Sequence, residues 1–84
     1  MSERRILVKL HARAGELAGA AEADVSVGNG ASCAAVKRQL AERHPALAGL
    51  LASCALATDA EFLADDAPVG DAASLHLIPP VSGG

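Results

Sequence analysis

The sequence predicts an α+β fold, in which a mixed sheet of four to five strands is crossed by one main helix. Three observations support this prediction. Segments with alternating apolar and polar residues lie near both ends of the chain, as expected for half-buried strands. A longer segment between them, from Cys33 to His44, carries apolar residues at helical spacing. The 84 residues make one small domain.

The first predicted strand, Arg4 to Ala12, is apolar at every second position. The alternation assigns one face to Ile6, Val8 and Leu10 and the other to Leu7, Lys9 and His11. A short helical turn or loop over residues 13–19 leads to a second strand, Ala23 to Val27, which we expect to form a hairpin with the first. Gly28-Asn29-Gly30 then ends this strand, because glycine and asparagine tolerate positive φ.

The main helix is predicted to begin after Ser32, whose hydroxyl can cap its first turn. Its buried stripe contains Cys33, Val36, Leu40 and Leu47. The residues expected to face water are Lys37, Arg38, Glu42 and Arg43. Pro45 ends the helix near His44, because the residue before a proline disfavours helical geometry.

The elements after the helix are short. One more turn over Ala46 to Leu51 is followed by a third strand, Cys54 to Thr58. Asp59-Ala60 connects it to a fourth strand, Glu61 to Leu63. Residues 65–73 are rich in turn-forming residues and lead to the last strand.

This order of elements fits a β-grasp sheet. The last strand, Ser74 to Ile78, turns Leu75 and Leu77 inward. A helical crossover requires the first and last strands to run parallel, so we expect them side by side at the centre of the sheet. The expected core contains Ile6, Val8, Val25, Val36, Leu40, Leu75 and Leu77.

The formal net charge is −3, and the charges are distributed unevenly. All seven basic residues lie at or before Arg43, whereas the side-chain charges after it are acidic. An acidic half repels phosphate backbones, and a chain with one aromatic residue lacks base-stacking platforms, so we expect no nucleic-acid partner. The acidic residues suit a basic surface on a protein partner.

No segment is typical of an export signal or a membrane span, which predicts a cytoplasmic protein without a membrane partner. Cys33 and Cys54 are then expected to stay reduced. They lack the CxxC spacing of a metal site, and each lies where a small buried apolar residue is expected. We therefore expect no bound metal and no bound cofactor.

The last six residues form a tail, Pro79-Pro80-Val81-Ser82-Gly83-Gly84, which follows a domain over residues 1–78. The two prolines have no backbone N–H, so the ladder of the last strand ends there, and they favour an extended chain. The four residues after them can reach about 14 Å when extended. The diglycine can pass a channel that is too narrow for larger side chains.

The C-terminal carboxylate of Gly84 is the group that this tail would present. A carboxylate is a poor acylating agent, because its oxygen is a poor leaving group. Transfer to AMP supplies a good leaving group, and attack by a sulfur donor then leaves a thiocarboxylate, which is a softer nucleophile. The sequence therefore predicts a sulfur carrier whose working group is Gly84.

The run Leu75-His76-Leu77-Ile78-Pro79-Pro80-Val81-Ser82-Gly83-Gly84 resembles the C-terminus of the small, sulfur-carrying subunit of molybdopterin synthase, a ubiquitin-like β-grasp protein. The resemblance spans nearly the whole chain. It includes Glu16-Leu17-Ala18-Gly19, Leu40-Ala41-Glu42-Arg43-His44-Pro45-Ala46-Leu47 and Glu61-Phe62-Leu63. Ubiquitin-like proteins generally share a diglycine end, whereas the form Pro-Pro-Val-Ser-Gly-Gly is more specific to the molybdopterin branch.

The resemblance implies a reaction sequence and partners. An ATP-dependent activating enzyme adenylates the terminal glycine, here Gly84, and sulfur from a sulfur donor protein replaces AMP to give a covalent thiocarboxylate. The tail then inserts into the large subunit of molybdopterin synthase, a heterotetramer with one small subunit at each end of a dimer of large subunits. Sulfur passes to cyclic pyranopterin monophosphate, and two deliveries build the dithiolene of molybdopterin. In this scheme the small subunit donates sulfur and is not itself catalytic.

Several positions depart from the family pattern. Leu10 and His11 replace aromatic residues late in the first strand, and Gly15 replaces an arginine before the Glu-Leu pair. Asp59-Ala60 replaces an Asn-Gly turn, and Asp71-Ala72-Ala73 replaces an Asp-Gly-Asp turn. We expect these changes to weaken turn chemistry and to alter partner contacts, whereas the tail is intact.

A mixed apolar patch is predicted on the outer face of the sheet. It contains Leu7, His11, His76 and Ile78, and beside the tail it forms a possible docking face for the large subunit. Two imidazoles without a third ligand give a weak case for zinc, so surface or interface histidines are the preferred interpretation. Two alternatives stay open: a sulfur carrier for thiazole or cysteine synthesis, and a ubiquitin-like binding module whose tail does no chemistry.

Overall fold

A computed structural model of the chain describes residues 3–80, and the tail residues Val81, Ser82, Gly83 and Gly84 lie outside the described residues. The strands are β1 (Glu3–Leu10), β2 (Glu22–Gly28), β3 (Ala55–Ala57), β4 (Phe62–Leu63) and β5 (Ser74–Ile78). The helical segments are α1 (Arg13–Ala18), α2 (Cys33–Arg43), the 3-10 turn η1 (Pro45–Leu47) and α3 (Ala48–Leu51).

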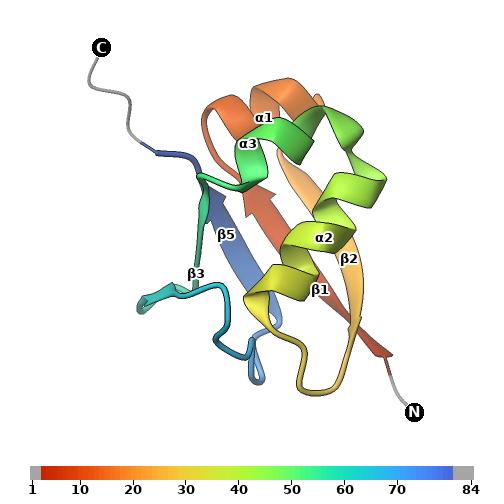
Figure 1. Cartoon of the computed structure of the whole chain (residues 1–84), viewed down its shortest axis with the longest axis vertical. Coiled ribbons are helices and arrows are strands. Elements are labelled where there is room, and N and C mark those ends of the chain that lie inside the picture. Colours follow the sequence, from red (N-terminus) through yellow and green to blue (C-terminus); the bar gives the residue numbers. More distant parts are fainter. Residues whose placement is uncertain (1–2, 81–84) are drawn as a thin grey trace.

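The five strands form one mixed sheet in the order β2-β1-β5-β3-β4. β1 pairs antiparallel with β2 and parallel with β5, so Val8 lies opposite Ala23 on one side and Leu75 on the other. β3 continues the sheet antiparallel to β5, and β4 forms its edge. The first and last strands are therefore neighbours at the centre, and the predicted β-grasp arrangement is confirmed (Figure 1).

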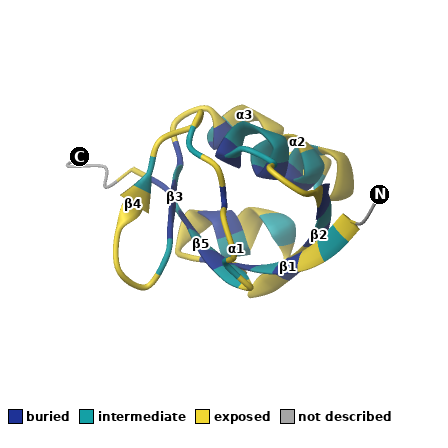
Figure 2. Cartoon of the chain, turned by 90° about the horizontal axis from the view of Figure 1, so that it is seen from below, coloured by how far each residue is buried: buried dark blue, intermediate teal, exposed yellow. Residues whose placement is uncertain are grey.

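One face of the sheet is covered by α2 and α3, and the buried residues lie between the two layers (Figure 2). The seven predicted core residues are all 0 % exposed: Ile6, Val8, Val25, Val36, Leu40, Leu75 and Leu77. Phe62 contributes little to this core, since it is 69 % exposed. The layers are therefore held by aliphatic side chains, which include Leu47 of the predicted helical stripe and, in addition, Leu56.

The ends of α2 are formed as predicted. The Ser32 hydroxyl accepts a hydrogen bond from the Ala35 N–H at 3.4 Å, and this caps the first turn. The helix ends at Arg43, and Pro45 begins η1. This 3-10 turn carries Leu47 into the core, where it extends the apolar stripe of α2.

β1 ends at Leu10, two residues before its predicted end. Ala12 has a φ of 52°, in the left-handed region that residues other than glycine rarely adopt. The chain turns there into α1, which ends in a left-handed Gly19 at a φ of 71°. The change of direction therefore lies between His11 and Arg13.

The turn between β3 and β4 does not use positive φ. Among residues 3–80, Ala12 is the only non-glycine residue with positive φ, so Asp59 and Ala60 do not adopt the left-handed conformation. The Thr58 hydroxyl accepts hydrogen bonds from the N–H groups of Ala60 and Glu61, both at 3.1 Å. The hydrogen bonds to the Thr58 side chain thus hold the turn in place of an Asn-Gly geometry. β3 ends at Ala57, one position earlier than predicted.

Arg4 holds the loop before β5. Its Nη1 donates to the Ala72 carbonyl at 2.7 Å, and its Nη2 donates to the Gly70 carbonyl. Gly70 has a φ of 61°, so the left-handed residue of this loop lies before the Asp71-Ala72-Ala73 segment. The first strand is therefore tied by a side chain to the segment that leads into the last strand.

The prediction that Lys37 faces water is wrong. Its side chain is 11 % exposed, and Nζ donates to the Cys54 carbonyl at 2.7 Å and to Asp65 Oδ1 at 2.8 Å. The aliphatic part of a lysine can cover apolar surface while its ammonium group reaches polar partners. The other three residues predicted to face water are exposed: Arg38, Glu42 and Arg43.

Candidate functional site

The tail leaves the body at the end of β5. Ile78 is the last paired residue, opposite Ala55 in β3, and the next residue cannot donate to the ladder because it is a proline. Pro79 is buried, which corrects the prediction that the chain is detached from this residue onward, and Pro80 is exposed. The tail over residues 79–84 otherwise stays a prediction, since its last four residues lie outside the described part.

A groove of about 490 Å³ lies at the root of the tail, and we call it the tail-root groove. Its apolar lining consists of Ala12, Leu50, Ile78, Pro79 and Pro80. His11 and Arg13 add polar groups to the lining. These residues come from the connection between β1 and α1, from α3 and from the end of β5. Figure 1 shows these segments at the same end of the molecule. A partner that receives the tail therefore also lies close to this groove.

The predicted docking residues share the outer face of the sheet. His11 and His76 meet there, with His11 Nε2 2.8 Å from His76 Nδ1 and the ring centroids 5.0 Å apart. Ile78 lines the tail-root groove together with His11, whereas Leu7 lies opposite Ser74 at the far end of β5. The structure thus brings three of the four residues to the tail, and their role in docking stays a prediction.

Asp59 extends the histidine pair into a chain of three side chains. His76 Nε2 donates a hydrogen bond to Asp59 Oδ1 at 2.7 Å, while Nδ1 of the same ring faces His11. The hydrogen bond from His76 lowers the pKa of the Asp59 carboxyl, and the charge of His76 adds to this. Desolvation opposes the shift, and the more distant charge of Lys9 lowers the pKa further. The carboxylate therefore orients the His76 ring, which the sequence alone did not predict.

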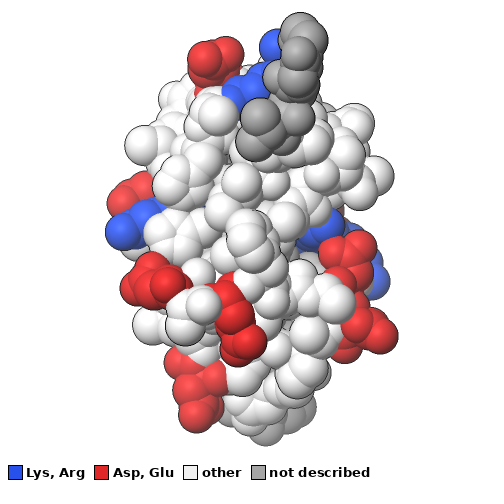
Figure 3. Space-filling view, turned by 90° about the vertical axis from the view of Figure 1, so that its left-hand side faces the viewer, with Lys and Arg blue, Asp and Glu red and all other residues white. Residues whose placement is uncertain are grey.

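Phe62 is an exposed residue of the same side that the sequence analysis missed. It lies on the edge strand β4 and borders a hollow of about 220 Å³ with His76 and Ile78. Leu63, the next residue, packs against the core. The strand alternation could have identified Phe62, because it places these two neighbours on opposite faces. Figure 3 shows this side of the molecule, with acidic side chains around largely uncharged surface.

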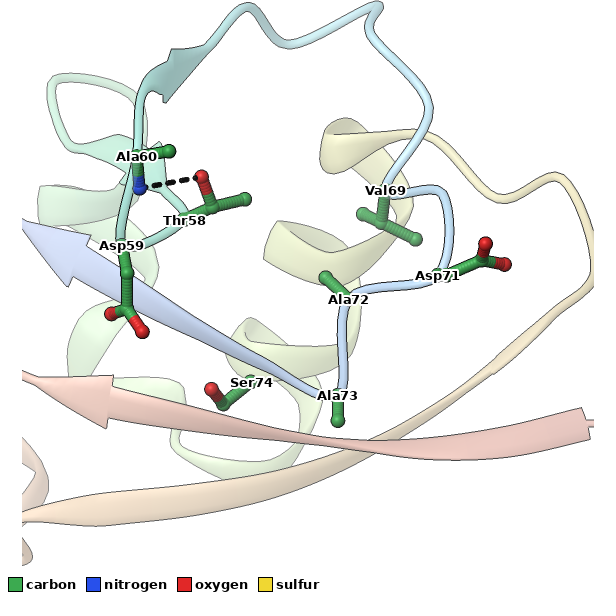
Figure 4. A pocket seen from close by; sticks show the side chains of 8 residues that line it. All are labelled: Thr58, Asp59, Ala60, Val69, Asp71, Ala72, Ala73 and Ser74. Atoms are coloured by element: carbon green, nitrogen blue, oxygen red, sulfur yellow. Dashed lines mark hydrogen bonds between the residues drawn. The ribbon is translucent and has the colours of Figure 1, made fainter.

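A separate hollow of about 460 Å³ lies between the turn after β3 and the loop before β5 (Figure 4). It is lined mainly by small side chains, and its charged residues are Asp59 and Asp71. It lies at the start of β5, where Ser74 begins the strand, and not at the end that carries the tail. This hollow therefore lies away from the tail and is not part of the candidate site.

Cys33 and Cys54 are buried free thiols, as expected of small apolar residues. Burial raises the pKa of both thiols. The charge of Asp65 adds to this at Cys33, and the Lys37 ammonium acts against it at both sites. The reactive form of cysteine is the thiolate, so these residues are poorly suited to a sulfur relay.

We expect both thiols to resist alkylation in the folded protein and to make the fold less stable at alkaline pH. In the unfolded chain they ionise near the ordinary pKa of 9.0, whereas the folded chain keeps both protons to higher pH. The free energy of unfolding is therefore unaffected by the thiols below this value and falls as the pH rises above it. Denaturation midpoints should show the decline, and a Cys33→Ala, Cys54→Ala double variant should flatten it. Equal alkylation rates with and without denaturant would contradict the expectation.

Gly15 marks a close approach of α1 to the end of β1. A Cβ added at this position would lie 3.0 Å from the Leu10 carbonyl oxygen and 3.3 Å from the Ala20 carbonyl oxygen. Both atoms belong to the backbone, so the arginine of the family pattern cannot replace Gly15 without a shift of α1. The exposed cation of this helix is instead Arg13, at the tail-root groove.

The described residues 3–80 offer little chemistry of their own. They contain no group of three or more His, Cys, Asp or Glu residues that could hold a metal ion. No helix in this part of the chain is long and apolar enough to cross a membrane. What the described part provides is a scaffold, in which a central strand ends at Ile78 beside an apolar groove.

A mixed sheet of this strand order, with parallel first and last strands at its centre and a helix packed across it, defines a ubiquitin-like β-grasp protein. The sequence pattern of the ThiS family matches residues 8–84. The chain belongs to the ThiS family.

Known proteins similar to this chain support the same assignment. The molybdopterin synthase sulfur carrier subunit of Chlamydomonas reinhardtii is 32% identical over 82 residues, which cover 95% of this chain and 99% of that protein. The crystal structure of SAMP1 from Haloferax volcanii matches with a TM-score of 0.83 and 27% identity, over 96% of this chain and 100% of that one. The solution structure of small archaeal modifier protein 1 from Methanosarcina acetivorans matches over 100% of both chains, with a TM-score of 0.79 and 22% identity. The ubiquitin-like β-grasp fold and the resemblance found in the sequence are thereby confirmed.

Proposed function

We propose that this chain is a sulfur carrier of molybdenum cofactor biosynthesis and that the carboxylate of Gly84 carries the sulfur. The observation that carries the proposal is the likeness to a molybdopterin synthase sulfur carrier subunit, which extends over 95% of this chain. The tail sequence supports it independently, because diproline and diglycine follow a central strand that is anchored on both sides.

In the proposed reaction the Gly84 carboxylate attacks the α-phosphorus of ATP in an activating enzyme, and pyrophosphate leaves. A persulfide of a donor protein then attacks the acyl carbon, and AMP leaves to give an acyl disulfide. A thiol attacks the donor's sulfur in this disulfide, so that a new disulfide forms on the donor and the thiocarboxylate remains on Gly84. This chain supplies neither the ATP site nor a catalytic side chain in the scheme. Its contribution is to present a narrow, extended tail that reaches into the active sites of other proteins.

The proposed acceptor partner is the large subunit of molybdopterin synthase, in a heterotetramer. There the thiocarboxylate of Gly84 transfers sulfur to cyclic pyranopterin monophosphate, and two transfers form the dithiolene. The described fold suits this role, since the tail-root groove, His11 and Ile78 adjoin the point where the tail leaves the body. Phe62 adds apolar surface on the same side.

Reconstitution from purified components tests this proposal. The chain is combined with its activating enzyme, ATP, a sulfur donor, the large subunit and cyclic pyranopterin monophosphate, and molybdopterin is measured by the fluorescence of its oxidised derivative. Product should form in proportion to the thiocarboxylated chain supplied. If the loaded chain supports thiazole or cysteine formation and never molybdopterin, the pathway assignment is wrong, while the carrier role remains.

A second candidate function is attachment of the Gly84 carboxylate to amino groups of other proteins. The observation that favours it is the 27% identity to SAMP1 from Haloferax volcanii. The SAMP1 of Methanosarcina acetivorans is called a small archaeal modifier protein. Both functions need the same activated acyl group, and they differ in the attacking nucleophile. Mass spectrometry of cell extracts distinguishes them, because attachment leaves a C-terminal peptide of this chain joined through Gly84 to lysine side chains after proteolysis.

A further inference from the structure

The tail-root groove carries positive charge at Arg13. Arg13 is exposed on its rim, and within residues 3–80 its guanidinium makes no hydrogen bond or ion pair. His11 lies two residues earlier, on the other side of the left-handed Ala12, and also lines the groove. The remaining lining is apolar, with Leu50, Ile78 and the diproline. An occupant of this groove is therefore offered apolar contacts together with hydrogen-bond donors for an anion.

The hydrogen-bond chain from Asp59 sets what His11 offers. Because His76 Nε2–H donates to the carboxylate, the 2.8 Å contact between the rings needs one hydrogen between His76 Nδ1 and His11 Nε2. With two neutral rings, His11 Nε2–H donates, and its Nδ1 is a bare acceptor. One added proton gives His11 an Nδ1–H, whereas two added protons would place two hydrogens in the contact and break it. A single proton thus changes the outer nitrogen of His11 from acceptor to donor.

The charged groups around the pair come from three elements. Lys9 lies opposite His76 in β1, and Arg13 begins α1 beside His11. From the turn between β3 and β4 come Asp59 and Glu61, which border the hollow next to His76. A proton added to the pair therefore lies between the Asp59 carboxylate and the groove. Histidine is the side chain that ordinarily changes its charge near neutral pH.

We propose that the tail-root groove binds an apolar side chain and a neighbouring carboxylate of the protein that receives the tail, and that this binding takes up one proton. The carboxylate bridges the Arg13 guanidinium and His11 Nδ1–H, and the apolar side chain contacts Leu50 and Ile78. This inference rests on the proposed function, in which a partner receives the tail. Charge complementarity favours an acidic occupant, since the two polar residues of the groove are both potential cations.

Binding to the large subunit tests the proposal, measured by calorimetry with the unloaded chain, so that a failure of sulfur loading does not affect the readout. Arg13→Glu should weaken binding at least tenfold, because it places a carboxylate against a carboxylate. Arg13→Lys keeps the positive charge and should retain most of the wild-type affinity. The matched control is Arg38→Glu, an exposed arginine in α2 outside the groove, which should bind as the wild type does. Unchanged binding by Arg13→Glu overturns the inference, and the proposed function stands if molybdopterin still forms.

The proton uptake has its own readout. The wild-type affinity should fall as the pH rises through the neutral range, and buffers of different ionisation enthalpy should report uptake of one proton. His11→Gln keeps a polar side chain that does not titrate, so its affinity should be independent of pH over this range. A wild-type affinity that is constant or rises with pH overturns the proposed proton uptake.

A small probe makes the test independent of the pathway partner. N-acetyl-Leu-Glu-amide should shift the NMR signals of the Leu50 and Ile78 methyl groups and of His11, whereas N-acetyl-Leu-Gln-amide should not. Equal shifts with both probes, or none with either, overturn the acidic-partner assignment even if the large subunit proves not to bind. A nuclear Overhauser contact between the Val81 and Leu50 methyl groups in the free chain would show that the tail itself occupies the groove, which also overturns it.

Discussion

Adding one residue after Gly84 is expected to abolish sulfur loading without changing the stability of the fold. The extension converts the Gly84 carboxylate to an amide and moves the new carboxylate past the position where the activating enzyme acts. The buried core lies between Ile6 and Leu77, so the free energy of unfolding should be that of the wild type. Intact mass after incubation with activating enzyme, ATP and sulfur donor gives the readout. The wild type should gain the mass of one oxygen-to-sulfur exchange, and the extended chain should not.

Two further variants separate length from shape in the tail. Deletion of Gly84 leaves the carboxylate about 3.5 Å short and should also prevent loading. Gly83→Ala should fold normally and load slowly, because its Cβ must enter the channel that admits the diglycine. Sulfur loading of the extended chain without removal of the added residue would show that Gly84 is not the working group.

Truncation of Leu40 to alanine is expected to cost about 2–5 kcal/mol of stability, the second large effect. Leu40 is 0 % exposed in the middle of the α2 stripe, so the change removes buried methyl groups and leaves a cavity. Small domains of this size have total stabilities near the lower end of about 5–15 kcal/mol, so the variant could unfold at ordinary temperature. Chemical denaturation with circular dichroism measures the shift in midpoint.

Leu17 provides the matched control for this prediction. It is an exposed leucine in another helix, 38 % accessible in α1, and Leu17→Ala should change the free energy of unfolding by no more than about 0.5 kcal/mol. A Leu40→Ala variant as stable as the Leu17→Ala control would mean that α2 does not pack with this face on the sheet.

The fold could be predicted because each main element has a strong local pattern. Alternation in β1, β2 and β5 and the helical stripe of α2 assigned all seven predicted core residues correctly. Element ends were less certain, because they depend on backbone geometry that residue type does not fix. Ala12 adopts a left-handed φ that sequence does not suggest for alanine, and this ended β1 early.

Interactions between distant segments account for what the sequence did not predict. The partners of Lys37 are Asp65, 28 residues away, and a Cys54 carbonyl, and their positions follow only from the folded chain. The bond from His76 to Asp59 likewise needs β3 beside β5. The shared outer face of His11 and His76 was predicted, because strand alternation assigns both residues to it. Their direct contact and the groove beside them were not, because the groove also needs α3 and Pro79.

The pairing of β1 with β5 also has a consequence for synthesis of the protein. Residues 7–10 of β1 can pair with β5 only after residues 74–77 have left the ribosome. Arg4 reaches its partners in the loop before β5 at the same late stage. A nascent chain that stops before β5 lacks the centre of its sheet, and contacts so distant in sequence form late in folding. Folding of this domain is therefore expected to be completed after translation of the tail has begun, so an activating enzyme that recognises the folded sheet would rarely meet a prematurely terminated chain.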